Sequence, residues 1–130
     1  MVDTTKYDPI THRIIGCAMR VHNELGNGFP EKVYQRALEI ELRAEGLAFE
    51  REKETLIYYK GEIIGKRIVD FLVEGCILVE LKATSEVTND NLNQVINYLK
   101  AFNLEVGLLI NFGTKSLFFK RFVKDQSKLV

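Results

Sequence analysis

The chain has 130 residues, 46% of them hydrophobic and 28% charged, which suits one domain with a single core and excludes a disordered composition. Its 18 basic and 18 acidic residues cancel, which argues against a protein that coats nucleic acid by charge alone. No apolar run approaches the roughly 20 residues that span a bilayer, and no signal-peptide stretch opens the chain. Two cysteines, Cys17 and Cys76, are too few for a disulfide framework or a zinc cage. We therefore expect one cytoplasmic domain over residues 1–130 with reduced thiols.

Two helices are predicted in the first third of the chain. The first begins with Asp8 as N-cap and Pro9 in its first turn, and Gly26 suits its end. Its apolar residues recur at helical spacing: Ile10, Ile14, Cys17, Ala18, Val21 and Leu25. The second helix opens at Pro30 and ends at Gly46, and its apolar stripe consists of Val33, Tyr34, Ala37, Leu38 and Leu42.

Strands dominate the rest of the chain. Residues 49–59 and 63–73 are separated by Lys60-Gly61, a dipeptide typical of a hairpin turn. Residues 76–83 are apolar on both faces until their charges begin, as in a central strand. A third helix is predicted from about residue 89 to 103, with a core face of Leu92, Val95, Ile96, Leu99 and Phe102. Strands at 106–112 and 117–123 complete the order ααβββαββ, which indicates an α/β fold with helices against a mixed sheet.

The strand at residues 76–83 carries charges that a buried strand normally lacks. Because side chains alternate along a strand, Glu80 and Lys82 share one face with Leu78. The preceding strand contains one acid, Asp70, and antiparallel pairing about a turn near residue 75 would place it opposite Glu80. Two carboxylates and one ammonium group would then meet at one point.

Such a cluster indicates a metal site. Two acids crowded into a partly buried place repel each other, and a divalent cation between them reduces that cost. Oxygen-only ligation by carboxylates suits Mg²⁺ or Mn²⁺ rather than Zn²⁺. A lysine beside the ion can hold or help to deprotonate an attacking water. The same three residues could instead form a buried ion network without a metal, and Glu-x-Lys alone is expected about once by chance in this composition.

Two helical segments add polar residues to this pattern. Glu31 and Tyr34 are three residues apart on one face of the second helix, and Asn91, Gln94 and Tyr98 form a polar stripe on the third. Each alone is more typical of a helix surface. The joint order of helical acid, aspartate, Glu-x-Lys and Gln-x-x-x-Tyr is much harder to obtain by accident.

These motifs resemble the GxxExxY proteins, a group within the PD-(D/E)XK nuclease superfamily. The signature is Gly28-Phe-Pro-Glu31-Lys-Val-Tyr34. The similarity covers nearly the whole chain and continues through Arg67-Ile-Val-Asp70-Phe, Val79-Glu80-Leu-Lys82-Ala, Gln94-Val-Ile-Asn-Tyr98 and Gly107-Leu-Leu-Ile-Asn-Phe-Gly113, ending at Lys120-Arg121. It departs from the pattern at Asn91, where a histidine often stands three positions before the glutamine.

The resemblance implies a restriction-endonuclease-like core and Mg²⁺- or Mn²⁺-dependent hydrolysis of phosphodiester bonds. It also implies a Gln-x-x-x-Tyr element like that of RecB-like nucleases, which lies by the active site and contacts nucleic acid. The implied site has Asp70, Glu80, Lys82, Glu31 and Gln94 for catalysis, Asp70, Glu80 and the Leu81 carbonyl for the metal, and Tyr98, Tyr34, Lys120 and Arg121 for the substrate.

The expected partner is nucleic acid, with DNA as the first candidate, and a homodimer is compatible with a small domain that has edge strands. The alternative is a catalytically inactive domain of the same fold that binds or regulates, which the zero net charge favours modestly. Residues 113–130 contain five basic residues and one acid. They could form a patch that faces phosphates, or merely a solvated end.

Overall fold

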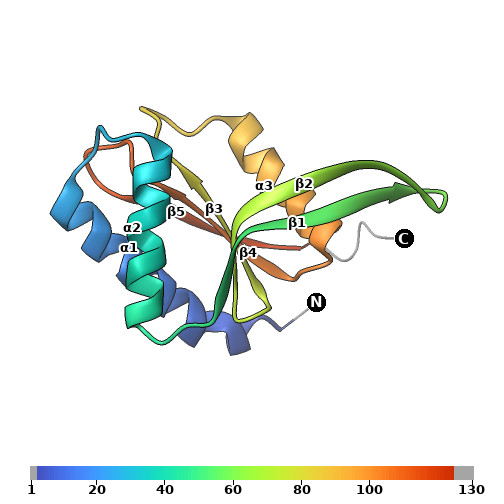
Figure 1. Ribbon diagram of the computed structural model, residues 1–130, viewed down its shortest axis with the longest axis horizontal. Coiled ribbons are helices and arrows are strands. Elements are labelled where there is room, and N and C mark those ends of the chain that lie inside the picture. The colour runs from blue at the N-terminus through green and yellow to red at the C-terminus, as the bar shows by residue number, and fades with distance from the viewer. Residues whose placement is uncertain (1–2, 125–130) are drawn as a thin grey trace.

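A computed structural model describes residues 3–124 as a mixed five-stranded sheet with helices on both faces (Figure 1). A short 3-10 turn, η1 (Thr5–Tyr7), precedes the helices α1 (Asp8–Leu25), α2 (Glu31–Ala44) and α3 (Asn89–Phe102). The strands are β1 (Phe49–Tyr59), β2 (Glu62–Val73), β3 (Ile77–Lys82), β4 (Val106–Asn111) and β5 (Phe118–Val123). The predicted α/β class and element order are confirmed.

The strands lie in the order β1-β2-β3-β4-β5. The β3–β4 pair is parallel, and the other three pairs are antiparallel. A parallel pair needs a crossover connection, and α3 supplies it. All of β4 is buried, as is all of β3 except its last residue, Lys82. The charged end of β3 therefore lies at the edge of the central core.

The alternating side chains of β3 belong to two separate cores. Ile77, Val79 and Leu81 pack on the side covered by α1 and α2, whereas Leu78 packs on the α3 side with Leu109. Glu80 and Lys82 therefore belong to the strand face that starts on the α3 side, as the alternation predicted.

The β1–β2 hairpin leaves the sheet part of the way along β2. That strand pairs with β1 along nearly its whole length, but with β3 only at the three pairs Val73–Ile77, Leu72–Leu78 and Phe71–Val79. Beyond them the hairpin projects from the body (Figure 1), and we call its outer part, from the Glu54–Ile68 pair to the Lys60-Gly61 turn, the arm. We call the place where the two strands separate, at Asp70 on β2 and Glu80 and Leu81 on β3, the fork.

Several local predictions need correction. Asp8 lies inside α1 and Tyr7 is the N-cap, although Pro9 is in the first turn as expected. Val33 and Ile96 were assigned to the core but are exposed. Each lies about 100° around its helix from a buried neighbour, because the stripe of α2 is centred on Tyr34 and that of α3 turns toward Tyr98.

Two expectations about the whole chain can be compared with the described residues. Cys17 is buried and Cys76 partly buried, and both are free thiols. In residues 3–124, no helix combines the length and the apolar character needed to cross a membrane.

Candidate functional site

Asp70 and Glu80 meet at the fork. The Phe71–Val79 pair, continued by one residue, places them opposite each other, so the predicted proximity is confirmed. The Asp70 backbone N–H donates to Glu80 Oε1 at 3.3 Å, and the Leu81 N–H donates to Asp70 Oδ2 at 2.8 Å. Carboxylates thus accept the hydrogen bonds of backbone groups that no longer have a ladder partner.

Glu80 is held in an environment that disfavours its charge. Its exposed fraction is only 6%. Burial, a hydrogen bond with the Asp70 side chain and the Asp70 charge together raise the pKa of Glu80 to about 9, against the weaker opposing effects of the Asp70 N–H and Lys82. At neutral pH this carboxyl therefore keeps its proton unless a cation compensates its charge.

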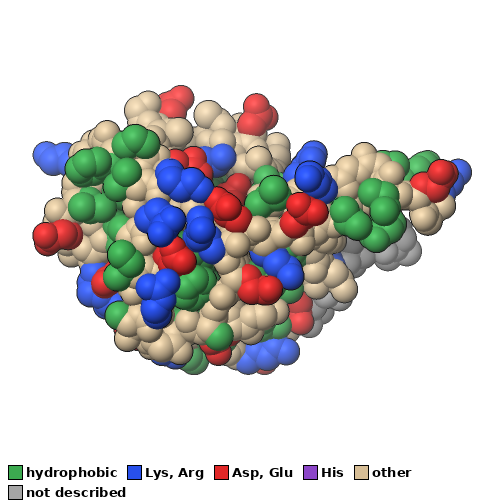
Figure 2. Space-filling model, viewed as in Figure 1, with side chains coloured by type: hydrophobic (Ala, Val, Ile, Leu, Met, Phe, Trp, Pro, Cys, Tyr) green, Lys and Arg blue, Asp and Glu red, His purple; other side chains and the backbone are tan. Residues whose placement is uncertain are grey.

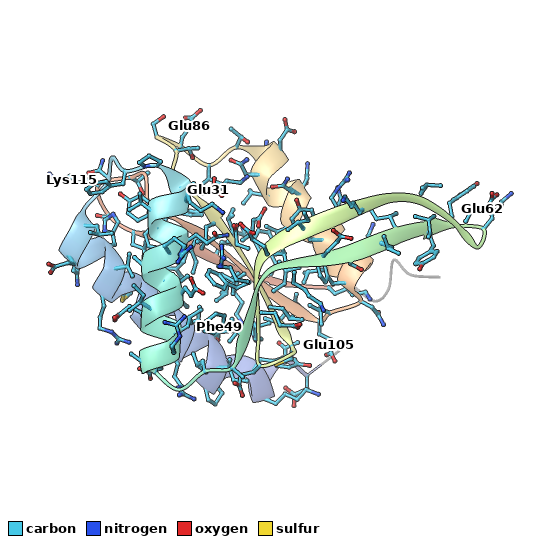
Figure 3. The ribbon with its side chains drawn as sticks, in the orientation of Figure 1. Glu31, Phe49, Glu62, Glu86, Glu105 and Lys115 are labelled. Atoms are coloured by element: carbon cyan, nitrogen blue, oxygen red, sulfur yellow. The ribbon has the colours of Figure 1, made fainter. Side chains whose placement is uncertain are left out.

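Glu31 and Lys82 act on the same acids through their charges. Glu31 is the first residue of α2, and Figure 3 shows it far from Glu62 at the tip of the arm. Burial and the nearby Asp70 raise the pKa of Glu31, while Lys82 and Lys32 lower it. Lys82 is half-buried and forms no direct ion pair with any acid among residues 3–124. Its ammonium group is thus near the acids without neutralising one of them.

A hollow of about 450 Å³, the fork pocket, opens beside Asp70. It is lined by Glu31, Lys32, Gln35, Glu52, Ile68, Val69 and Asp70. One acid of the fork and the helical acid Glu31 therefore share a space that solvent can enter. This pocket gives a small ligand access to the site.

Gln35 belongs to this site although it was not predicted from the sequence. Its Nε2 donates to Asp70 Oδ1 at 2.8 Å, and its Oε1 accepts from Lys32 Nζ at 3.1 Å and Arg51 Nη1 at 3.3 Å. One signal could have found it. Gln35 lies four residues after Glu31, which places the two on the same face of α2.

The residues at the fork fit a hard divalent cation. Each oxygen of Asp70 and Glu80 has a further lone pair beyond its hydrogen bond. The Lys82 carbonyl accepts from the N–H of Phe112, the residue that follows β4, and because successive carbonyls of a strand alternate in direction, the Leu81 carbonyl faces the fork. No group of three His, Cys, Asp or Glu side chains able to hold a metal occurs within residues 3–124. Two carboxylates suffice for Mg²⁺, which keeps several waters and binds substrate phosphates.

Gln94 and Tyr98 line a groove of about 780 Å³ between α3 and the arm, here called the α3 groove. Tyr98 is buried, and its burial and the Glu80 charge raise its pKa, which places the phenol near the fork. Gln94 Oε1 is buried without a hydrogen-bond partner among the described residues. Tyr98 thus lines the α3 groove and also responds to the charges of the two acids.

Asn91, where the resembling pattern often has a histidine, caps α3. Its Oδ1 accepts from the Thr88 N–H at 3.0 Å, and its own N–H donates to Thr88 Oγ1 at 3.2 Å. These reciprocal bonds form a capping box. The asparagine side chain thus has a structural role at the start of the helix that carries Gln94.

Tyr34 was predicted to contact substrate, and the structure corrects this. Its side chain is fully buried, and its ring stacks on Phe112 with centroids 4.6 Å apart. Its hydroxyl donates to the Gly26 carbonyl at 2.6 Å and accepts from the Phe29 N–H at 3.2 Å. The tyrosine of the signature therefore holds the α1–α2 turn and so positions the start of α2, where Glu31 lies.

Lys120 and Arg121 lie on β5, which is separated from β3 by β4. Arg121 Nη2 donates to the Thr4 carbonyl at 2.9 Å and pairs with Asp8 at 3.2 Å, so the structure does not bring it to the fork. Lys120 lines a different hollow, beside Phe118 and Phe119. The last two charges of the predicted basic patch, Asp125 and Lys128, lie outside the described residues.

The mixed sheet with flanking helices and a pair of acids on adjacent central strands defines the restriction-endonuclease-like class of nuclease folds. The chain belongs to the PD-(D/E)XK nuclease superfamily, whose family model matches residues 8–122. A search of curated protein sequences finds no match.

Two solved structures share the fold. The crystal structure of SSO0001 is similar with a TM-score of 0.58 and 21% identity, over 95% of this chain and 63% of that one. An alkaline exonuclease (LHK-Exo) from Laribacter hongkongensis is similar with a TM-score of 0.50 and 12% identity, over 99% of this chain and 75% of that one. The chain thus spans less than two thirds of SSO0001, and at these identities the likeness concerns the fold.

Proposed function

We propose that this protein is a metal-dependent nuclease of the GxxExxY group that hydrolyses phosphodiester bonds in nucleic acid, with DNA as the first candidate substrate. The observation that carries the proposal is the meeting of Asp70 and Glu80 at the fork. Two acids are placed together, neither forms an ion pair with a basic side chain within residues 3–124, and one of them is too buried to ionise easily. A bound cation removes this electrostatic conflict.

Each residue of the site has a role in this proposal. Asp70, Glu80 and the Leu81 carbonyl would hold Mg²⁺ or Mn²⁺. Such a cation would supply Lewis acidity toward the scissile phosphate and lower the pKa of a bound water. Lys82 orients the attacking water and offsets the negative charge that grows on the phosphate. Glu31 adds a third acid at the mouth of the fork pocket.

The substrate is proposed to lie in the α3 groove. Arg67 and Lys100 line this groove and can pair with phosphates, while Asn97 and the unpartnered oxygen of Gln94 offer hydrogen bonds. Tyr58, on the arm, presents an exposed ring on which a base can stack. The groove leads toward Tyr98 and the fork, so a strand bound there would bring a phosphate to the acids.

The test is a cleavage assay on single-stranded, duplex and branched DNA and on RNA, each with Mg²⁺, Mn²⁺ or EDTA. We expect cleavage of at least one substrate with a divalent cation and none with EDTA. Glu80→Gln should lose the activity, whereas Glu54→Gln, which removes an exposed acid on the arm, should keep it. Light scattering on the same samples tests for a homodimer. Among the described strands, β1 pairs with a neighbour on one side only, so its other edge could pair with a second copy of the chain.

Two results would contradict the proposal. Cleavage that survives in Glu80→Gln would assign the activity to another site or to a contaminating nuclease. Binding of nucleic acid with no cleavage under any of these conditions would favour the catalytically inactive alternative instead.

A further inference from the structure

Gln35 is a polar residue in the buried face of α2. Its exposed fraction is 3%, and its helix neighbours Tyr34 and Leu38 are fully buried. Burying a side-chain amide is costly unless its groups are hydrogen-bonded. Here the amide donates to Asp70 and accepts from both Lys32 and Arg51, so its position is fixed from two sides.

The two cations that hold Gln35 are themselves held by acids outside the fork. Lys32 pairs with Glu52. Arg51 pairs with Glu52 at 3.5 Å and with Glu39 at 3.6 Å. The charges of Lys32 and Arg51 are therefore compensated by these acids. The group that contacts Asp70 is the neutral amide of Gln35, which donates an N–H in a fixed orientation.

Asp70 depends on this donor for its orientation. Its Oδ2 accepts from the Leu81 N–H on β3, and its Oδ1 accepts from Gln35 on α2. The two bonds attach the carboxylate to two different elements, which restricts rotation about its side-chain torsions. Without Gln35, Asp70 Oδ1 would lose the hydrogen bond from the Gln35 amide, and the carboxylate could rotate away from Glu80.

We propose that Gln35 is a positioning residue that orients Asp70 for cation binding at the fork. This rests on the proposed function, in which Asp70 is a metal ligand. The amide suits the role because it donates to the carboxylate without a positive charge that would compete with the cation. Partners that orient ligands in this way commonly contribute a factor of about 10 to 100 in metal affinity.

The first test needs no metal. Gln35→Met keeps the length of the side chain and removes the donor. The backbone proton of Leu81, hydrogen-bonded to Asp70, should resonate downfield in the metal-free protein and move upfield in Gln35→Met. An unchanged Leu81 signal in a folded Gln35→Met would overturn the inference, whatever the protein's activity. If Gln35→Met does not fold, Gln35→Asn, which withdraws the amide by one methylene, replaces it.

The second test is calorimetric titration with Mn²⁺ alone. We expect Gln35→Met to bind Mn²⁺ about 10- to 100-fold more weakly than the wild type. The control is Lys66→Met, which makes a methionine substitution on the exposed arm away from the fork pocket, and it should bind as the wild type does. An equal loss in Lys66→Met would show that the effect is not specific to Gln35 and contradict the proposal.

The two proposals fail in different ways. Equal Mn²⁺ affinity of wild type and Gln35→Met would overturn the positioning role while leaving the nuclease proposal intact. A wild type that neither binds Mn²⁺ nor cleaves would overturn the nuclease proposal, and the Leu81 signal would still decide whether Gln35 orients Asp70.

Discussion

Two buried or half-buried glutamates in this molecule have opposite surroundings. On the outer face of α2, Glu39 has an exposed side-chain fraction of 16% and lies 3.2 to 3.6 Å from Arg36, Arg43 and Arg51. Figure 2 shows basic and acidic side chains interleaved over this face. At the fork, Glu80 is more buried, and it lies beside another acid, Asp70.

The difference separates an acid that stabilises the fold from one that needs a ligand. The charge of Glu39 is compensated within the chain, so this acid belongs to a surface ion network of the kind that contributes little to stability. No direct ion pair with a described residue compensates the charge of Glu80, and the chain keeps the acid at an energetic cost. Such conflicts are typical of functional sites.

The largest expected effect is the difference between neutralising Glu80 at the fork and neutralising Glu39 in the surface ion network. Glu80→Gln should lower the rate of cleavage by at least on the order of 1,000-fold, because a carboxylate ligand of the cation that would compensate the phosphate is lost. Glu39→Gln should leave the rate within about twofold, since its charge is used in a surface network. The measurement is kcat/KM on the preferred substrate. Equal losses in the two variants would erase the distinction.

Lys82 should have the next largest effect. Lys82→Met keeps the aliphatic stem and removes the ammonium, so we expect kcat to fall by about 100-fold or more while KM changes little. Steady-state kinetics over a range of substrate concentrations measure both constants. The matched control is Lys66→Met, which removes an exposed ammonium on the arm. A change confined to KM would instead assign Lys82 to substrate binding.

The raised pKa of Glu80 predicts how the stability of the metal-free protein depends on pH. The unfolded chain loses the Glu80 proton near pH 4.5, whereas the folded chain retains it to about pH 9. The unfolded state therefore binds fewer protons in this window, and the free energy of unfolding falls as pH rises, by on the order of 1–3 kcal/mol at pH 7. Below pH 4.5 Glu80 is protonated in both states, so it does not change the dependence of the free energy of unfolding on pH.

Urea unfolding of the wild type and Glu80→Gln between pH 5 and 9 checks this. The free energy of unfolding of Glu80→Gln should fall less with rising pH than that of the wild type. The stability of the variant relative to the wild type should therefore rise with pH. Saturating Mn²⁺ should also reduce the slope of the wild type, because the cation favours the ionised carboxylate. Parallel profiles of the two proteins would mean that Glu80 ionises normally.

The smallest effect is expected on the arm. Arg67→Gln removes a cation that lines the α3 groove. We expect a several-fold rise in KM or Kd at moderate salt and a shallower dependence of binding on salt, with kcat unchanged. Fluorescence anisotropy with a labelled oligonucleotide measures both. An unchanged salt dependence would place the nucleic acid elsewhere.

The pairing at the fork could be predicted from the sequence because its determinants are local. The Glu74-Gly75 turn sets the register between β2 and β3, and the alternation along β3 assigns Glu80 and Lys82 to one face. The fold class followed from the order of periodic segments. These features depend on residues close together in the chain.

Other features depend on contacts between distant segments and could not be predicted in this way. Gln35 stands between a tyrosine and an arginine on a charged helix, and only its bond to Asp70 distinguishes it from a surface glutamine. Arg121 was read with Lys120 as a phosphate ligand, but its partners are Thr4 and Asp8 at the other end of the chain. The point at which the arm separates from β3 could not be predicted either, because the strand pattern of β2 continues without a break through Asp70.

The account as a whole depends on cation binding between Asp70 and Glu80. Crystals soaked in Mn²⁺ and measured near the manganese absorption edge test this most directly. We predict one anomalous peak at the fork, within bonding distance of both carboxylates, that disappears in Glu80→Gln. Anomalous density elsewhere only, or an empty fork in a protein that still cleaves nucleic acid, would contradict the account.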